Sequence, residues 1–241
     1  MSIRTLTVRS TRDTRRMTNL GGYYWPDGDR GNGGLFKAAG EESTLRWIEV
    51  QQQAARCYAD ITRRARSSPH TVVCAGGNVG IMPRTYARHF QQVVTLEPDP
   101  LNWQCLLKNL EGDSNVRCIN AALGQRASTG HIVHNTANCG ASYLDPCNSE
   151  PGSVDVVELD CLELMTLDLL QLDVEGMEYF ALQGAVNLIQ QHCPVIVLEI
   201  NSCTLRYGRT QGDIDEWLGQ RGYTESKALQ RGRDHVYLHG G

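Results

Sequence analysis

The chain has 241 residues, of which 41% are hydrophobic and 21% are charged, and its net charge is −4. This composition is typical of a folded globular protein, and the length suits one α/β domain better than two. The negative balance argues against general nucleic-acid binding. No apolar run approaches the roughly 20 residues of a membrane-spanning helix, so we expect no association with a membrane.

The nine cysteines are scattered singly along the chain and include no C-x-x-C pair. This spacing lacks the usual signal of a zinc site, and no other metal-ligand pattern is evident, so we predict no metal. Several cysteines lie inside apolar segments, where a free thiol acts as a small hydrophobe. The pattern favours a reducing, cytoplasmic location.

The first 40 residues are expected to lie outside the main domain. Residues 1–20 contain five arginines and one acid and indicate a flexible basic arm, with an organelle transit peptide as the alternative. Residues 21–40 are rich in glycine and carry three adjacent aromatic side chains, which predicts a loop or flap. Apolar residues then recur at three- and four-residue steps from Glu42 to about Arg66, which predicts a helical extension.

Strand-sized apolar segments alternate with helical segments through the rest of the chain. The predicted strands are 71–75, 93–97, 116–123, 167–173 and 195–200, and the predicted helices are 80–90, 100–110, 175–192 and 211–220. This alternation predicts an α/β fold with a Rossmann-like, doubly wound, mostly parallel sheet. Segments 131–135 and 154–160 alternate in polarity and predict an inserted antiparallel strand pair. Two short edge strands, near 223–228 and 235–239, end the chain.

These elements compose a single domain over residues 41–241. In doubly wound sheets, ligands bind beyond the carboxyl ends of the strands, at the topological switch point. The first predicted strand ends in the run C-A-G-G-N-V-G at 74–80. Gly76 and Gly77 permit positive φ and a close approach of a ligand, and Gly80 lets the next helix pack against the sheet.

Glu97 ends the second predicted strand, about 20 residues after this loop. An acid there can accept hydrogen bonds from both hydroxyls of a ribose, and Asp99 is a nearby alternative for this role. The loop and the acid together imply an adenosine-containing cofactor. NAD sites favour G-x-G-x-x-G, whereas Asn78 stands here in place of the second glycine. The spacing favours S-adenosylmethionine, with NAD as the alternative.

The fourth predicted strand ends in two acids. Asp173 lies at its tip, and Glu175 follows at the start of the next helix. A carboxylate that ends a buried strand needs a ligand, a hydrogen-bond donor or water. Glu175 has a simpler alternative role as a partner of the helix dipole. Both acids are candidate catalytic groups.

Five segments, in this order, resemble the FkbM family of S-adenosylmethionine-dependent methyltransferases. They are AGGNVG, VVTLEPDPLNWQCLLKN, NAALG, LLQLDVEGMEYFALQGA and PVIVLEIN. The resemblance implies a class I methyltransferase fold, with a cofactor half at about 69–124 and an acceptor half at about 125–241. It implies methyl transfer to an oxygen of a small molecule or glycan. A further similarity to FkbM-like proteins of tailed phages would make the compartment the cytoplasm of a host cell.

The resemblance also implies a role for each matching residue. The cofactor-binding residues would be Cys74, Gly76, Gly77, Asn78, Gly80, Glu97, Pro98, Asp99 and Ala121. Asp173 and Glu175 would lie beside the transferred methyl group. Glu199, Asn201 and Gln171 would lie on the acceptor side.

Two positions depart from the family pattern. Relatives often have an aspartate at the position of Cys74, where it supports the amino group of the cofactor, and a lysine at the position of Gln171. If that lysine deprotonates the acceptor in relatives, this chain needs another base. The candidates are the two acids beside the methyl group and a histidine of the inserted segment, His131 or His134.

The main hypothesis is therefore an S-adenosylmethionine-dependent methyltransferase that acts on an oxygen of a sugar or other small hydroxylated acceptor. The two departures motivate a second hypothesis, a catalytically silent cofactor-binding or structural module. The arginine-rich start keeps an RNA methyltransferase open as a minor alternative. An NAD-dependent oxidoreductase is disfavoured by the loop spacing.

Overall fold

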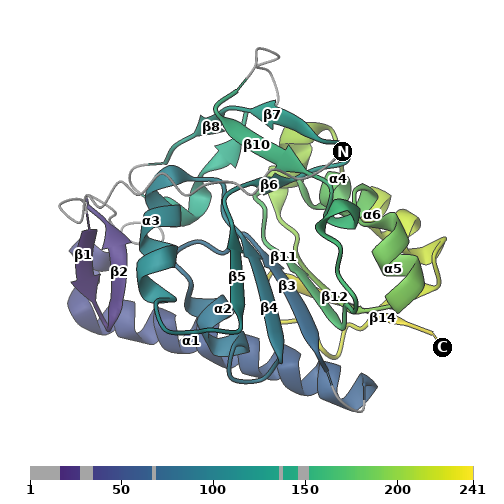
Figure 1. Ribbon diagram of the computed structural model, residues 1–241, viewed down its shortest axis with the longest axis horizontal. Helices are drawn as coiled ribbons and strands as arrows, with labels where there is room; N and C mark the ends of the chain where they lie inside the picture. Colours follow the sequence, from purple (N-terminus) through teal and green to yellow (C-terminus); the bar gives the residue numbers. More distant parts are fainter. Residues whose placement is uncertain (1–16, 28–34, 67–68, 136–137, 146–151, 241) are drawn as a thin grey trace.

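The computed structural model describes residues 17–27, 35–66, 69–135, 138–145 and 152–240. Its centre is a mixed sheet of seven strands. These strands are β3 (Thr71–Ala75), β4 (Gln92–Leu96), β5 (Val116–Ile119), β11 (Leu169–Leu172), β12 (Val195–Glu199), β13 (Tyr223–Glu225) and β14 (Asp234–His239). They lie in the order β13-β14-β12-β11-β3-β4-β5 (Figure 1).

The five strands from β12 to β5 are parallel, whereas β14 runs antiparallel to both of its neighbours. The chain moves outward from β3 through β4 to β5 and then returns to the other side of β3 at β11. This reversal between β3 and β11 is the topological switch point. The predicted doubly wound, mostly parallel sheet is confirmed. The prediction of an edge strand near 235–239 is wrong, because β14 pairs on both sides, and of these two strands β13 alone is at an edge.

Helices cover both faces of the sheet (Figure 1). They are α1 (Leu35–Ala65), α2 (Ile81–Tyr86), α3 (Pro100–Asn109), α4 (Glu178–Gln183), α5 (Val186–His192) and α6 (Gln211–Gly219). Side chains alternate along β3 as in any strand. Val72 and Cys74 pack in one core layer with α1 and α2, whereas Val73 and Ala75 pack in the other with α4, α5 and α6.

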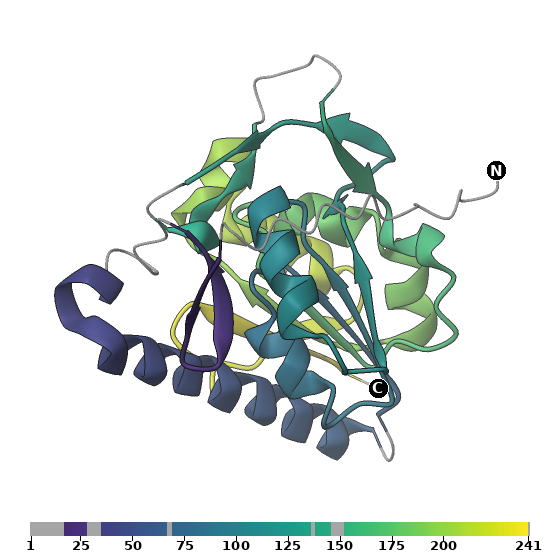
Figure 2. The same ribbon diagram turned by 60° about the vertical axis from the view of Figure 1, so that its left-hand side comes forward.

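The N-terminal region forms an antiparallel hairpin where the sequence predicted an arm and a loop. β1 (Met17–Leu20) pairs with β2 (Tyr23–Pro26), and the two glycines between them have φ values of 63° and 78°. Two positive φ values are what a type I′ turn requires, so a Gly-Gly pair between strands is a hairpin signal. α1 also begins earlier than predicted, at Leu35. Figure 2 shows the hairpin lying against α1 beside α3. Most of the predicted basic arm lies outside the described residues.

The inserted segment pairs differently from the prediction. β6 (Ala122–Leu123), β7 (Ser128–Gly130) and β10 (Val154–Val157) form a small sheet, and β8 (Ile132–Val133) pairs with β9 (Tyr143–Leu144). The inserted segment thus contains antiparallel pairs as predicted, but 131–135 and 154–160 pair with other segments and not with each other. Strands of two or three residues are too short for polarity alternation to specify a partner. These strands lie over the carboxyl ends of the central strands (Figure 1).

Several predicted elements are shorter than expected or divided. The predicted strand 116–123 splits between β5 and β6, and the predicted helix 80–90 ends at Tyr86. The predicted helix 175–192 is divided into α4 and α5 at Gly184. A Cβ at Gly184 would lie 2.1 Å from the carbonyl oxygen of Gly124, so this close approach excludes a side chain. Among the described helices, none combines the length and the apolar character that crossing a bilayer requires.

Candidate functional site

The loop after β3 approaches the tip of β11 more closely than a side chain would permit. A Cβ at Gly76 would lie 1.8 Å from the carbonyl oxygen of Asp173, and Gly76 has a φ of 80°. The N–H groups of Gly76 and Gly77 donate to the carbonyl oxygen of Leu96 at 3.1 and 2.9 Å. The next positive φ belongs to Asn78, at 47°. The loop thus ties the ends of β3, β4 and β11 together at the switch point.

Glu97 lies directly beyond β4 and is only 5% exposed. Its Oε2 accepts the backbone N–H of Asn78 at 2.7 Å, and its Oε1 accepts that of Asp99 at 2.8 Å. Burial raises the pKa of Glu97 to about 7, although these two N–H donors favour the charged form. An ionised carboxylate offers about four acceptor positions, so Glu97 keeps capacity for further donors such as hydroxyl groups.

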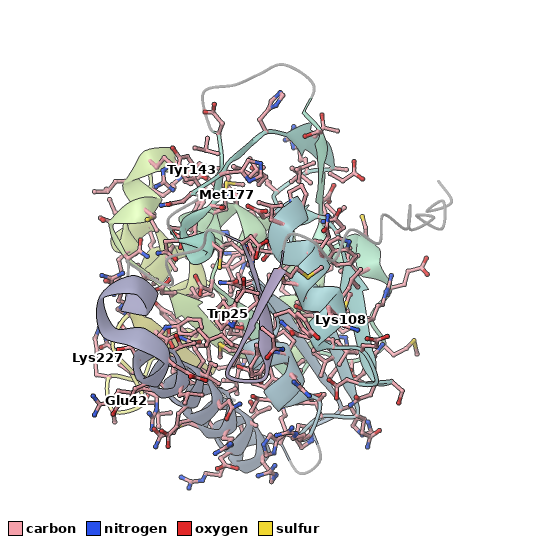
Figure 3. The ribbon with its side chains drawn as sticks, turned by 90° about the vertical axis from the view of Figure 1, so that its left-hand side faces the viewer. Trp25, Glu42, Lys108, Tyr143, Met177 and Lys227 are labelled. Atoms are coloured by element: carbon pink, nitrogen blue, oxygen red, sulfur yellow. The ribbon has the colours of Figure 1, made fainter. Side chains whose placement is uncertain are left out.

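A cavity of about 610 Å³, including its open mouth, lies beside Glu97. Five of the predicted cofactor residues line it, and they come from the ends of β3, β4 and β5: Gly76, Asn78, Glu97, Pro98 and Ala121. The inserted segment supplies the opposite wall through residues that include Cys139 and Tyr143. Figure 3 shows Tyr143, a residue of β9 (Tyr143–Leu144), close to Met177, and both line this cavity. We refer to it as the cofactor cavity.

A wider cavity of about 1650 Å³, again including its open mouth, adjoins the first. Five residues line both cavities: Gly76, Asn78, Gly140, Asp173 and Glu175. Glu199 and Asn201, predicted on the acceptor side, line only the wider cavity, as do Trp47 and Gln51 of α1. The two cavities therefore meet at the predicted catalytic acids. We refer to the wider one as the acceptor cavity.

Three carboxylates are grouped where the cavities meet. Side-chain oxygens of Asp173, Glu175 and Glu199 all lie within 4.8 Å of one another. Burial and the adjacent Glu199 carboxylate raise the pKa of Asp173 well above its usual range. Burial and Glu199 also raise the pKa of Glu175. Like charges this close do not ionise together readily, so the group favours holding a proton that it can exchange with a bound molecule.

Glu178 holds this corner in place, although the sequence did not single it out. It is 1% exposed, and its Oε1 accepts the N–H groups of Val174 and Gly176, each at 3.2 Å. These bonds hold the turn in which Glu175 has a φ of 54°. Burial raises the pKa of Glu178 to about 7. The available signal was a glutamate at the first position of a helix, where it can reach back to N–H groups without helical partners.

Cys74 and Gln171 line neither cavity. They are register partners across β3 and β11, and Cys74 Sγ donates to Gln171 Oε1 at 2.7 Å. Cys74 packs in the core layer of α1 because side chains alternate along the strand, so Ala75 and not Cys74 borders the cofactor cavity. Burial raises the pKa of the Cys74 thiol. The structure thus contradicts direct contact of Cys74 with the cofactor and of Gln171 with the acceptor.

Three further predicted cofactor residues and both candidate histidines lie outside the cofactor cavity. Gly77 lines the acceptor cavity instead, and Gly80 precedes α2 with a φ of 94°. Asp99 is the N-cap of α3 and does not line the cofactor cavity. His134 Nδ1 lies 2.9 Å from Asp99 Oδ2, and His131 lines neither cavity. Neither histidine is placed to act as the base.

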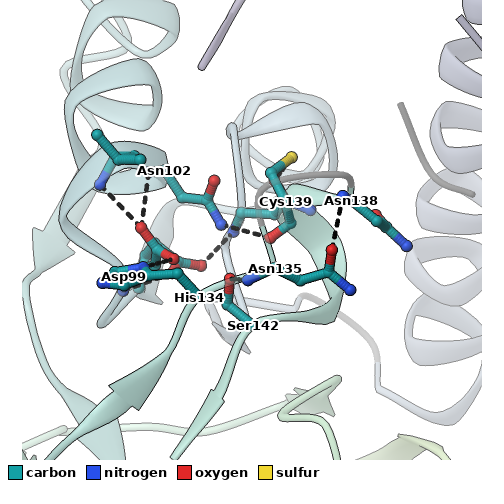
Figure 4. Close-up of polar contacts among 10 residues, drawn as sticks. Asp99, Asn102, His134, Asn135, Asn138, Cys139 and Ser142 are labelled. Carbon is teal, nitrogen blue, oxygen red and sulfur yellow. Dashed lines mark hydrogen bonds and ion pairs between the residues drawn. The ribbon is translucent and has the colours of Figure 1, made fainter. Parts of the chain in front are cut away.

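Polar contacts fasten the inserted segment over the cofactor cavity (Figure 4). The buried Asn102 donates through Nδ2 to the carbonyl oxygen of Cys139 at 2.8 Å. Cys139 Sγ lies 3.4 Å from Asn78 Oδ1 in the loop after β3. The contact of His134 with Asp99 joins the same segment to the start of α3. The cavity wall is therefore bonded to the residues that would hold the cofactor.

The sequence pattern of the methyltransferase FkbM domain matches residues 76–225, more than half of the chain. The chain belongs to the FkbM methyltransferase family. The predicted resemblance is confirmed, and residues 76–225 of this FkbM-family protein are a methyltransferase domain. Family membership removes the ground for the NAD-dependent alternative. No curated protein has a significantly matching sequence.

Solved structures of methyltransferases are similar to this chain at low identity. Methyltransferase FkbM from Methylobacillus flagellatus KT is 19% identical with a TM-score of 0.49, over 71% of this chain and 44% of that one. CalS10, an amino pentose methyltransferase from Micromonospora echinaspora, is 14% identical with a TM-score of 0.46, over 78% and 91%. Magnesium protoporphyrin IX methyltransferase from Synechocystis PCC 6803 is 13% identical with a TM-score of 0.44, over 79% of each chain. This chain spans less than half of the Methylobacillus protein.

The residues around the cofactor cavity fit S-adenosylmethionine. Glu97 is buried, borders the cavity and has acceptor capacity beyond its two N–H donors, as the two hydroxyls of a ribose require. The side chain of Asn78 and the backbone at Gly76 border the point where both cavities meet. The FkbM-family protein thus has a site of suitable chemistry at the switch point of its sheet.

Proposed function

We propose that this protein methylates a hydroxyl oxygen of a small-molecule or glycan acceptor. The observation that supports this most is that the cofactor cavity and the acceptor cavity meet at Asp173 and Glu175. An acceptor in the wider cavity would thereby have one hydroxyl beside the carboxylates and next to the cofactor. Such alignment of two reacting groups is the main contribution of a methyltransferase protein to the rate.

The chain's own residues would divide the work between binding and proton transfer. Glu97 holds the ribose, while Gly76 and Asn78 border the methionine part of the cofactor. When bound, S-adenosylmethionine supplies a methyl group activated by its sulfonium sulfur. Asp173, with its pKa raised by burial and by Glu199, accepts the proton of the acceptor hydroxyl. Glu175 lies within 4.8 Å of both partners and completes the acidic group.

The hypothesis of a catalytically silent module loses its motivation. It was based on Cys74 and Gln171, and these residues bond to each other in the core instead of lining a cavity. The RNA methyltransferase alternative depends on the basic arm, whose first 16 residues lie outside the described part. We further propose a reducing compartment such as the cytoplasm, because the nine cysteines are scattered singly along the sequence.

Two measurements test the proposed function. Titration calorimetry with S-adenosylhomocysteine should show saturable binding that is lost in Glu97→Ala. Transfer of a labelled methyl group to a panel of hydroxylated small molecules and glycans should then identify an acceptor. Absence of binding of both S-adenosylmethionine and S-adenosylhomocysteine would overturn the proposal.

A further inference from the structure

One wall of the acceptor cavity comes from outside the matched family region. Trp47 and Gln51 line this cavity, and they lie four residues apart on α1, so they share one helix face. The family match begins only at residue 76. Residues that this chain adds to the acceptor side are candidates for its own specificity.

Trp47 is held by a packed aromatic contact with the N-terminal hairpin. Its ring centroid lies 5.8 Å from that of Trp25, and the two ring planes are inclined by 58°. Trp25 is 4% exposed, and its Nε1 donates to the carbonyl oxygen of Leu20 at 3.0 Å. Trp47 itself is half-buried. A flat apolar surface therefore borders the cavity with little freedom to move.

The hairpin is also bonded to the loop after β3. Asn109 Oδ1 accepts the N–H of Tyr24 at 2.7 Å. Its Nδ2 donates to the carbonyl oxygens of Tyr24 and Val79 at 2.8 and 2.7 Å. Val79 lies between Asn78 and Gly80 in the loop after β3, whose residues line the cofactor cavity and the acceptor cavity. The position of Trp47 relative to the cofactor site is therefore set by packed elements.

The rest of the acceptor cavity combines amide groups with an excess of negative charge. The charged and amide side chains that line it, apart from Gln51, are Asn78, Asn138, Asp173, Glu175, Glu199, Asn201 and Arg233. A phosphate or carboxylate on the acceptor would meet three carboxylates, with a single arginine to offset them. A neutral ring with many hydroxyls suits both the flat surface of Trp47 and the amide and carboxylate groups of this cavity. Its C–H face packs on an indole, and its hydroxyls bond to amides and carboxylates.

We propose that Trp47 and Gln51 recognise an uncharged sugar ring, with the indole of Trp47 against the C–H face and the amide of Gln51 bonded to hydroxyls. This assignment rests on the proposed methyltransferase function of the same site. Neither residue lines the cofactor cavity, so loss of acceptor recognition is separable from loss of cofactor binding.

The test compares sugar binding with cofactor binding in matched variants. Binding of methyl glycosides of glucose, galactose, mannose and rhamnose is measured by saturation-transfer NMR with S-adenosylhomocysteine present. Glucose 6-phosphate and glucuronic acid are the charged comparisons. The variants are Trp47→Ala, Trp47→Phe and Gln51→Ala, and the control is Arg46→Ala, at an exposed position of α1 that lines neither cavity.

We expect the wild-type protein and Arg46→Ala to bind at least one neutral glycoside. Trp47→Ala should weaken that binding roughly tenfold, while Trp47→Phe retains most of it. Gln51→Ala, which removes an amide but no aromatic surface, should weaken it by a smaller factor. Cofactor affinity should stay within twofold in all variants, which also shows that they are folded.

Three outcomes would overturn the proposal. They are unchanged glycoside binding in both Trp47→Ala and Gln51→Ala, binding of no neutral glycoside by a protein that binds the cofactor, and preference for the charged sugars. In each of these the methyltransferase function stands. Failure of the wild-type protein to bind the cofactor would instead remove the proposed function and this assignment together.

Discussion

Cys74 Sγ donates a 2.7 Å hydrogen bond to Gln171 Oε1 across the register of β3 and β11. The two residues are 1% and 5% exposed. Because the register sets these positions side by side, the aspartate and lysine that the resemblance to the FkbM family implies there would also be neighbours. In this chain Cys74 and Gln171 are a neutral, hydrogen-bonded pair in the core. The two departures seen separately in the sequence are therefore coupled through one contact.

An aspartate at position 74 should destabilise the core around the Cys74–Gln171 pair. Cys74→Asp places a carboxylate among apolar neighbours and opposite the neutral side chain of Gln171. We expect it to destabilise the fold by about 3 kcal/mol or more, a decrease in Tm of roughly 6 °C or more. Cys74→Ala should cost less than half of this. Calorimetric unfolding of the three proteins measures the difference, and tighter cofactor binding in Cys74→Asp would contradict the core position of this residue.

Cofactor affinity should depend on pH through Glu97. Its pKa is raised to about 7, and only the ionised form accepts from both ribose hydroxyls. Between pH 8 and pH 6 the ionised fraction falls roughly tenfold, so the Kd for S-adenosylhomocysteine should rise by about the same factor. Glu97→Gln should bind roughly 10- to 100-fold more weakly at pH 8. Its Kd should show no such pH dependence. A wild-type Kd that is constant over this range would exclude Glu97 as the titrating group.

Glu199 should set the pH at which the candidate base works. Its charge contributes to the raised pKa of Asp173, so Glu199→Gln should lower that pKa. A base acts in its deprotonated form, so the decline of kcat/KM on acidification should move to lower pH in this variant. Cofactor affinity should be unchanged, because Glu199 lines only the acceptor cavity. A decline that stays in place or moves to higher pH would argue against proton transfer to Asp173.

The inserted segment should respond to the loss of Asn102. Asn102→Ala removes the bond to the carbonyl oxygen of Cys139, and we expect cofactor affinity to fall roughly five- to tenfold. Amide hydrogen exchange over residues 138–144 should become faster. His134→Ala is the matched comparison, because its contact with Asp99 belongs to a side chain that is 44% exposed. That variant should change affinity by no more than about twofold. An equal loss of cofactor affinity in the two variants would show that the Asn102 bond is not the main contact that holds the inserted segment in place.

The strand ends were the most predictable part of the site. Glu97, Asp173 and Glu199 were identified because acids that end buried strands are unusual, and the parallel sheet brings all three to one edge. The face of the sheet to which a strand residue points was harder to predict from the sequence. Cys74 and Ala75 are adjacent in sequence, yet only Ala75 borders the cofactor cavity, and the period-2 alternation assigns faces only once the register is known.

The sequence by itself determined the doubly wound α/β fold, the family and the cofactor class, because these depend on strand and helix periodicity and on residues close together in the chain. Only the tertiary structure decided that Cys74 and Gln171 form a core pair, that Glu178 holds the turn of Glu175, and that Trp47 borders the acceptor cavity. Each of these relationships joins different elements. Register and packing set their distances, and no local pattern of residues encodes them.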